Sequence, residues 1–270
     1  QYRRVRDSLS HRLKYAIKNG TISTAYQPIV HGMTGKVSGF EVLARWHDKK
    51  FGSVPPNVFI EKAEDLGLQE KLNKLIVNKA LEECSKGLAC NPEVYLSFNI
   101  ETKDLLGGGL VRHISDTARK HGILAGQIAI EMLEGATADI SKIERRIESL
   151  RAYGHKVLID DFGSGYSSLS YLARLNVDVI KIDKSFSQAA GTGSPAEIVL
   201  QKIYEIAKAM NAQIVFEGVE TEAQKIAILE FCPDALIQGW LFSKALPITE
   251  LIERVKSQTA RGKAMNFAHD

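Results

Sequence analysis

Two acidic residues stand side by side at the end of an apolar run in the segment KVLIDDFGSGYSSLS, Lys156 to Ser170. Asp160 and Asp161 close the apolar run, and a stretch rich in Gly and Ser follows them. Two like charges at the end of a buried strand repel each other and lose hydration, which costs free energy. Such a pair is therefore expected where it binds positive charge.

Polar side chains also recur at the C-terminal ends of the other predicted strands. One buried acid is usually a satisfied polar group of the core, but scattered structural residues would not occupy the same end of strand after strand. In a closed parallel barrel these ends meet at one face, where side chains of separate strands converge. The residues are Glu41, Asn99, Glu131, Asp160, Asp161, Lys181, Glu217 and Gln238.

This set of side chains predicts a divalent metal site. Several carboxylates around one point cannot all stay ionised without positive charge, and Lys181 supplies only one unit. Carboxylates with one amide oxygen and no His or Cys suit Mg²⁺, Mn²⁺ or Ca²⁺ rather than zinc. Adjacent Asp160 and Asp161 allow one carboxylate to bridge two metals about 3.5–4 Å apart while the other binds the second metal alone. That geometry is used for phosphoester hydrolysis.

The Gly-Ser segment after the acid pair is interpreted as backbone that closes over a ligand. Its GSG could be mistaken for a dinucleotide-binding fingerprint, but the third glycine is absent. The two preceding acids would also repel a pyrophosphate unless a metal intervened. We therefore exclude a Rossmann site.

Short strand-like runs alternate with helical patterns along the chain, which favours βαβ units and a parallel sheet. Eight strands in about 250 residues match a (β/α)₈ barrel, with an open doubly wound sheet as the alternative. Helices are predicted over Ile140 to Tyr153, over Glu197 to Met210, and before the first strand, where Val5, Leu9, Leu13 and Ile17 share a face and Asn19-Gly20 ends the helix. The predicted strands are 24–30, 37–46, 94–100, 127–133, 156–161, 178–183, 213–219 and 235–240.

Composition excludes several classes of protein. The 270 residues are 44% hydrophobic and 25% charged with a net charge of +3, which is ordinary globular composition and gives no reason to expect a nucleic-acid polymer as partner. The three Cys residues have no CxxC spacing, which argues against a disulfide framework and a zinc site. The sequence contains neither an apolar run of about 18 residues nor a secretory signal pattern.

The segment GFEVLARW, residues 39 to 46, resembles the E-A-L-x-R-W signature of the EAL-domain cyclic di-GMP phosphodiesterases. The resemblance covers about residues 9 to 255, and the order and spacing of its motifs are specific where each motif alone would be weak. The other motifs are YQPI (26–29), FIEKAEDLGL (59–68), FNI (98–100), EMLE (131–134), DDFGSGYSSL (160–169), IKIDKSF (180–186), EGVET (217–221) and QGWLFSKALP (238–247).

The resemblance implies a fold and a division of the chain. The fold is of the α/β class, a TIM-like (β/α)₈ barrel whose first strand runs antiparallel to the others. We expect an N-terminal basic amphipathic helix or linker over 1–20, the EAL domain over 21–258 and a C-terminal tail over 259–270.

The resemblance also implies an activity and roles for individual residues. The activity is hydrolysis of cyclic di-GMP to linear pGpG with two Mg²⁺ or Mn²⁺ ions in the active site. Ca²⁺ is expected to inhibit it. Glu41, Asn99, Glu131 and Asp160 would bind the first metal, and Asp160, Asp161 and Glu217 the second. Lys181 would orient the attacking water and Glu217 would serve as general base, so that these two and Asp160 are the catalytic residues. Substrate would be bound by Gln27, Leu43, Arg45, Lys181, Glu220 and Gln238, and Glu134 would anchor the loop after Asp161.

A few positions depart from the family pattern. Val42, Trp240 and Ala245 are interpreted as harmless replacements. Leu133 replaces the Thr of E-x-T-E, and loss of that hydroxyl is expected to loosen the network around Glu134 and lower activity rather than metal binding. The alternative function is a catalytically weak or inactive cyclic di-GMP receptor, although every metal-ligand position is filled. A sugar-metabolising barrel has no support beyond the fold.

The first eighteen residues are strongly basic. Six Lys and Arg residues accompany a single acid, Asp7, and the chain opens without Met. Basic clusters follow membrane spans on the cytoplasmic side. We therefore expect a cytoplasmic domain of an inner-membrane-anchored protein with an upstream sensor domain. The alternative for the helix itself is that it packs on the barrel with a solvated basic face. The resemblance to the EAL family further implies a homodimer that pairs through the helix after the Gly-Ser loop.

Overall fold

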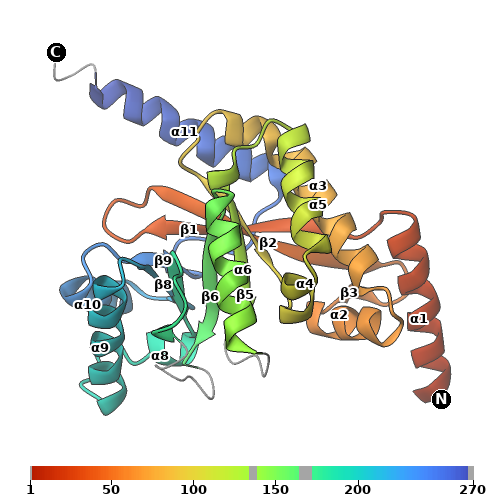
Figure 1. The fold of residues 1–270 in the computed structure, drawn as a ribbon, viewed down its shortest axis with the longest axis horizontal. Coiled ribbons are helices and arrows are strands. Elements are labelled where there is room, and N and C mark those ends of the chain that lie inside the picture. The colour runs from red at the N-terminus through yellow and green to blue at the C-terminus, as the bar shows by residue number, and fades with distance from the viewer. Residues whose placement is uncertain (1, 134–138, 164–171, 267–270) are drawn as a thin grey trace.

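Eight strands form a closed barrel in the computed structural model, which describes residues 2–133, 139–163 and 172–266 (Figure 1). Around the barrel the strands follow the order β1-β9-β8-β7-β6-β5-β4-β2, and β2 pairs with β1 to close it. Closure excludes the open doubly wound sheet. The barrel strands are β1 (Ser23–His31), β2 (Val37–Asp48), β4 (Tyr95–Asn99), β5 (Ile128–Leu133), β6 (Lys156–Phe162), β7 (Val179–Ile182), β8 (Gln213–Glu217) and β9 (Leu236–Gln238).

The first strand runs against its neighbours, as the resemblance implied. β1 pairs antiparallel with both β2 and β9, whereas every other neighbouring pair in the barrel is parallel. β1 and β2 are joined by a short hairpin, so they must be antiparallel, while the parallel strands are joined by crossovers. All eight strands expected from the sequence are confirmed.

An apolar layer fills one level of the barrel interior. It consists of one buried side chain from each of seven strands: Ile29, Tyr95, Ala129, Leu158, Val179, Val215 and Leu236. The eighth strand contributes Gly39, where an added Cβ would lie 2.6 Å from the Tyr95 ring, so the tyrosine occupies the space of the missing side chain. This layer closes the barrel and forms the floor of the site described below.

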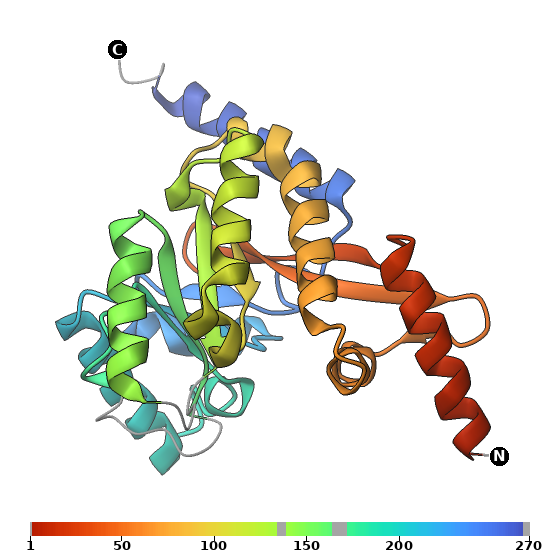
Figure 2. The same cartoon turned by 45° about the vertical axis from the view of Figure 1, so that its right-hand side comes forward.

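Helices surround the barrel, and the main core lies between them and the outer faces of the strands (Figure 2). The predicted helices over 140–153 and 197–210 are confirmed as α6 and α9. Asp139 caps α6 through Ser141 N–H, and α9 begins with a proline at its first position, where no N–H is needed. The covering helices are α3 (Gln69–Ala89), α4 (Thr102–Gly107), α5 (Gly109–Lys120), α6 (Ile140–Ala152), α8 (Lys184–Ser187), α9 (Pro195–Ala209), α10 (Glu222–Phe231) and α11 (Ile248–Asn266), with a 3₁₀ turn at Ala125–Gln127.

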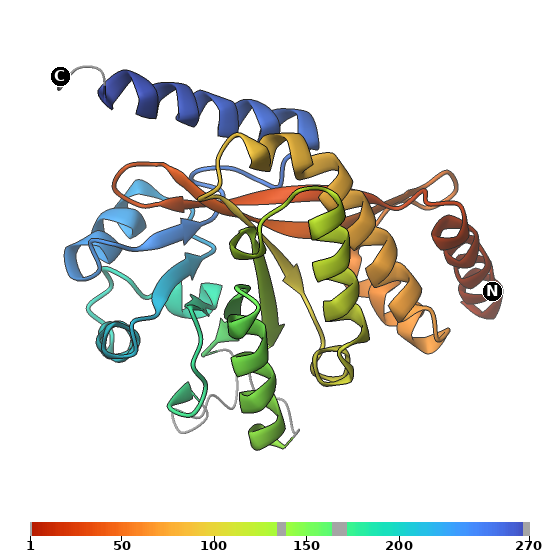
Figure 3. The same ribbon diagram turned by 45° about the horizontal axis from the view of Figure 1, so that its top comes forward.

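The N-terminal helix packs on a second, smaller core at one end of the molecule (Figure 3). Helix α1 (Tyr2–Lys18) places Leu13, Ala16 and Ile17 against Trp46 of β2 and Phe59 of α2 (Pro56–Asp65). Beyond the barrel, β2 also pairs with β3 (Gly52–Val54), a strand that the sequence did not predict. The helix itself is confirmed.

A helix lies at or across each of the two expected limits of the domain. α1 packs on the domain that it precedes, and α11 continues past residue 258 to Asn266. The division at residues 20 and 258 therefore stays a prediction. Within the described part of the chain, none of the helices has both the length and the apolarity needed to cross a lipid bilayer.

Candidate active site

The polar side chains of the site form a second layer inside the barrel, directly above the apolar layer. Side chains alternate between the two faces of a strand, so the residue two positions beyond each apolar-layer residue also points inward. On the reversed strand β1 this residue lies two positions earlier. The layer is Gln27, Glu41, Ser97, Glu131, Asp160, Lys181, Glu217 and Gln238.

Lys181 is the centre of this polar layer. Its side chain is 1% exposed, and its ammonium nitrogen lies 2.6 Å from Glu217 Oε1, 2.8 Å from Asp160 Oδ1 and 3.5 Å from Glu41 Oε2, and also bonds Glu131. Burial alone would lower the pKa of Lys181, but the four surrounding carboxylates raise it well above its ordinary value. Lys181 is therefore a permanent cation among the acids Glu41, Glu131, Asp160, Asp161 and Glu217, which together form the acid ring.

Glu41 is fixed in place by two amides as well as by Lys181. Asn99 Nδ2 donates to Glu41 Oε1 at 2.8 Å, and Gln238 Nε2 donates to Glu41 Oε2 at 2.6 Å. Burial would raise the pKa of Glu41, but the Lys181 charge and these hydrogen bonds outweigh it and leave the pKa below its usual range. Glu41 is accordingly a carboxylate with a defined orientation.

The pKa values of Glu131 and Glu217 are shifted in the opposite direction, upward. Burial raises the pKa of Glu131 well above its usual value, and the charges of Glu41 and Asp160 add to the effect while Lys181 opposes it. Burial likewise raises the pKa of Glu217 to about 7. Among the described residues no group donates a hydrogen bond to Glu131 Oε2, although this oxygen is buried. An orphaned buried carboxylate oxygen is a position where a cation would fit.

The acid pair of the sequence lies on a β-bulge. Ile159 pairs with Ile180 and Phe162 with Ile182, so β6 has one more residue than β7 across this interval. Asp161 takes a positive φ of 53°, a conformation that Asp tolerates better than most residues. In a regular strand adjacent side chains would point to opposite faces. The extra residue removes that alternation and brings both carboxylates to the site.

The acids form two groups that share one residue. Glu41, Glu131 and Glu217 place carboxylate oxygens within 4.8 Å of one another, and so do Asp160, Asp161 and Glu217. Both groups consist of hard oxygen donors, which is the donor set that Mg²⁺ and Mn²⁺ prefer. The residues thus fit two neighbouring cations. Glu217 is common to both groups, and Asp160, which the resemblance implied for both metals, belongs to the second group.

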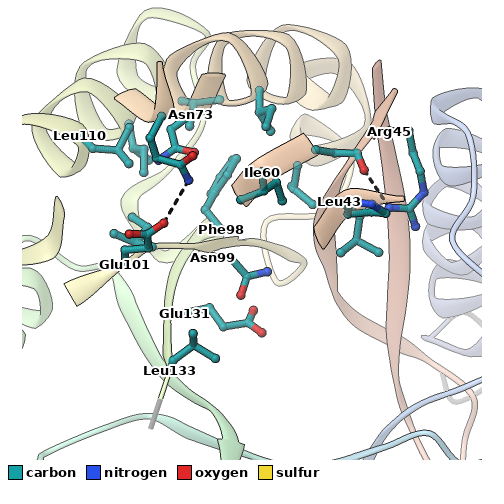
Figure 4. A pocket seen from close by; sticks show the side chains of 18 residues that line it. Leu43, Arg45, Ile60, Asn73, Phe98, Asn99, Glu101, Leu110, Glu131 and Leu133 are labelled. Atoms are coloured by element: carbon teal, nitrogen blue, oxygen red, sulfur yellow. Dashed lines mark hydrogen bonds between the residues drawn. The ribbon is translucent and has the colours of Figure 1, made fainter. Parts of the chain in front are cut away.

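A cavity of about 330 Å³ opens beside the acid ring, between β2, β4 and the helices α3 and α5 (Figure 4). Asn99 and Glu131 border it toward the acid ring, and Leu43 and Arg45 border it from β2. Arg45 is part-buried, and its Nη1 donates to the carbonyl of Ala44 at 2.9 Å. The wall is otherwise largely apolar and includes Ile60, Val77, Phe98, Leu110 and Leu133.

The remaining residues expected to bind substrate lie around the same end of the barrel. Gln27 is the cross-strand partner of Glu41, and Gln238 contacts Glu41 directly. Glu220 follows β8 and forms an exposed ion pair with Lys184, whose nitrogen lies 2.5 Å from Glu220 Oε1. Leu133 ends β5, is 52% exposed and lines the cavity. Glu134, expected to anchor the loop, lies outside the described residues, as does most of the Gly-Ser segment.

Sequence reasoning missed two features of the site. Ser97 belongs to the polar layer, fully buried, and among the described residues its hydroxyl has no hydrogen-bond partner. Strand alternation from Asn99 would have pointed to it. Glu41 is inside a long strand rather than at its end, because β2 continues to Asp48 in antiparallel pairing with β1 and β3. Glu41 does end the part of β2 that pairs with β4.

Comparison with known proteins agrees with this geometry. The family model described as EAL domain matches residues 10–245. A probable cyclic di-GMP phosphodiesterase of Escherichia coli K12, PdeB, is 38% identical over 88% of this chain and 45% of its own length. The oxygen sensor protein DosP of the same organism is 36% identical over 90% of this chain and 30% of its own. The chain thus spans less than half the length of these curated relatives.

A solved structure has the same fold as this chain. The PaMucR phosphodiesterase in complex with c-di-GMP superimposes with a TM-score of 0.83 and 29% identity, and the match covers 90% of this chain and 99% of that one.

Proposed function

Because this chain belongs to the EAL-domain family, we propose that it is a metal-dependent phosphodiesterase that hydrolyses cyclic di-GMP to linear pGpG. The observation that supports the proposal most strongly is the cluster of five carboxylates at one end of the barrel, four of which contact Lys181. Each buried carboxylate loses hydration, and the single positive charge of Lys181 offsets only part of the charge of five acids, so the site favours bound cations.

The two acid groups would each hold one divalent cation. Glu41, Asn99, Glu131 and Asp160 would hold the first cation, and Asp160, Asp161 and Glu217 the second. Bound Mg²⁺ or Mn²⁺ would stabilise charge on the phosphoryl oxygens and lower the pKa of water. A cation beside Glu217 would also lower the pKa of that carboxyl, so that it is ionised at neutral pH.

The chain's own residues would position the substrate and move the proton. Arg45 would bind the non-bridging phosphate oxygens, a task that suits the two-pronged guanidinium. Lys181 would orient the attacking water, whose oxygen adds to phosphorus as the bond to the 3′-oxygen breaks. Glu217 would accept the proton that this water loses, and the leaving 3′-oxygen would take a proton from solvent water. The largely apolar cavity beside Leu43 would exclude bulk water from this region.

Three finer assignments belong to the same proposal. Ca²⁺ would occupy the site without supporting turnover, because it accepts more ligands in a looser geometry than Mg²⁺. The working protein would be a homodimer. An upstream sensor domain would regulate it, in line with the greater length of the relatives.

The test is incubation of the purified chain with cyclic di-GMP and Mn²⁺ or Mg²⁺, followed by chromatography of the nucleotides. Linear pGpG should accumulate, and excess chelator should abolish it. A Glu131→Gln protein serves as the matched control and should convert little or none. If the wild-type chain binds cyclic di-GMP but leaves it intact, the proposal of an enzyme is wrong and the chain is a receptor.

A further inference from the structure

One large aromatic side chain stands exposed near the end of the barrel that carries the acid ring. Trp240 is 63% exposed and lies two residues after Gln238, the amide that bonds Glu41. Two residues span at most about 7 Å of chain, so the indole is attached close to the site. The other tryptophan, Trp46, is buried against Phe59 in the smaller core.

The turn that carries Trp240 is fixed by close backbone packing. An added Cβ at Gly239 would lie 2.1 Å from the carbonyl oxygen of Val219, so this position requires glycine. The N–H of Leu241 donates to the same carbonyl at 3.1 Å. The loops after β8 and β9 are thereby joined, and the position of the indole beside the mouth of the barrel is defined.

Two ammonium groups lie over the ring of the indole. Lys244 Nζ is 4.6 Å from the ring centroid, and Lys184 Nζ is 6.0 Å from it. The Lys184 stem crosses Gly218, where an added Cβ would come within 2.4 Å of it, and its nitrogen pairs with Glu220. Gly218 directly follows Glu217 of the acid ring. Residues after three neighbouring strands, β7, β8 and β9, therefore meet around Trp240.

We propose that Trp240 is a stacking platform for one guanine base of the substrate, which would displace Lys244 and Lys184 from over the ring and accept hydrogen bonds from them. This inference rests on the proposed function and assigns a residue that selects the base. Indole faces stack on nucleobases. Lysine donates to O6 and N7 of guanine, whereas adenine presents an amino donor in place of O6 and would meet the ammonium groups unfavourably. A single exposed aromatic is ordinary, but one flanked by two cations beside a phosphodiester site matches this ligand.

The first experiment measures steady-state kinetics of Trp240→Ala, Trp240→Phe and a matched control, Tyr153→Ala, which removes an aromatic that is 74% exposed at the end of α6. Trp240→Ala should raise KM for cyclic di-GMP about 5- to 100-fold while kcat changes little, because stacking is made equally before and during reaction. Trp240→Phe should restore part of the loss, and Tyr153→Ala should match wild type. An unchanged KM in Trp240→Ala would overturn the proposal.

A second experiment measures the fluorescence emission of the Trp240 indole. The sequence has two Trp residues, so Trp46→Phe leaves Trp240 as the sole source of tryptophan emission. With Ca²⁺ present, cyclic di-GMP should quench that emission saturably, and cyclic di-AMP should do so only at much higher concentration. Equal responses to the two nucleotides, or none while binding is measurable by calorimetry, would contradict the inference. If Trp46→Phe fails to fold, the kinetic experiment still decides.

The two proposals fail in different ways. If the wild-type chain produces no pGpG, the proposed function is wrong. If it produces pGpG with a KM that Trp240→Ala leaves unchanged, only the assignment of Trp240 is wrong.

Discussion

Lys181 contributes to the site in a way that its residue type alone did not suggest. From the sequence we inferred only that Lys181 supplies one unit of positive charge, which is too little to neutralise the acids. In the structure its ammonium contacts four carboxylates and is almost completely buried. It therefore stabilises the acid ring when no other cation does so, in addition to any role toward water and phosphate.

Lys181→Met should destabilise the metal-free protein strongly. Removing one partner of a buried ion pair costs about 3–5 kcal/mol, because the other partner is left without compensation. Added Mn²⁺ should recover much of the loss by supplying charge at the same place. Urea unfolding in chelator and in Mn²⁺ measures both effects, with Lys202→Met, an exposed residue of α9, as control. A loss of the same size in both solutions would show that Lys181 does not stabilise the acids.

Asp161 combines an unfavourable backbone conformation with an unfavourable charge. Its φ is positive, and burial together with the charge of Asp160 raises the pKa of its carboxyl. Asp161→Asn keeps the conformation and removes the charge, so the metal-free protein should become more stable. Hydrolysis should fall on the order of 10³-fold, about 4 kcal/mol in the barrier, because a proposed metal ligand is lost. Unfolding curves and initial rates of the same preparation check the two effects, and a variant that loses stability would argue against this reading.

At the residue scale, much of the site could be predicted and its geometry could not. The types of Glu41, Asn99, Glu131, Asp160 and Glu217 were enough to indicate hard-metal chemistry. The bulge was not predictable, because it depends on how β6 pairs with β7 and leaves no signal in hydrophobic alternation. The contacts of Lys181 depend on barrel closure, which brings four separate strands around it.

Strand β2 is the element that connects the barrel to the N-terminal helix. Its first half carries Glu41 into the polar layer, and its second half extends beyond the barrel to Trp46 and Asp48. Asp48 is buried and accepts hydrogen bonds from Arg12 Nε at 2.6 and 2.7 Å. This pair fixes helix α1 against the extension of β2.

The contact between α1 and β2 should depend on pH. Burial would raise the pKa of Asp48, but the hydrogen bonds from Arg12 and from the N–H groups of Lys50 and Phe51 outweigh it, so the pKa lies below its usual value. A depressed carboxyl pKa contributes stability above the unfolded pKa of about 4, and this contribution is lost as pH falls through the folded pKa.

Asp48→Asn should therefore lower the free energy of unfolding at pH 7, on the order of 2 kcal/mol for hydrogen bonds to a charged group. The difference from wild type should shrink below about pH 4, where the wild-type carboxyl also becomes neutral. Urea unfolding at both pH values measures this, with Glu93→Gln as the control for an exposed pair. A difference that is independent of pH would contradict the account of this contact.

Local patterns predicted the barrel strands well and missed the strand outside the barrel. The barrel strands and the helices α1, α6 and α9 followed from apolar periodicity. β3 consists of Gly52, Ser53 and Val54, in which no apolar run indicates a strand. β2 was predicted over 37–46 and continues to Asp48, where antiparallel pairing with β3 rather than its own composition holds it.

At the scale of the whole molecule, closure of the barrel is what turns scattered polar residues into a site. Residues as far apart in sequence as Glu41 and Gln238 become hydrogen-bonded neighbours because β1 pairs with both β2 and β9. Local periodicity indicated a parallel sheet with helices but could not show the reversal of β1. That feature came only with the resemblance to the EAL family.

In the proposed reaction, the acid ring promotes attack of water on a phosphodiester of cyclic di-GMP. Hydrolysis with Mn²⁺ in ¹⁸O-labelled water, followed by mass spectrometry of the nucleotides, shows whether water is the attacking group. We expect linear pGpG with one ¹⁸O in its terminal phosphate, formed by the wild-type chain and not by Asp161→Asn at comparable rates. Intact cyclic di-GMP, or a product without the label, would rule this reaction out.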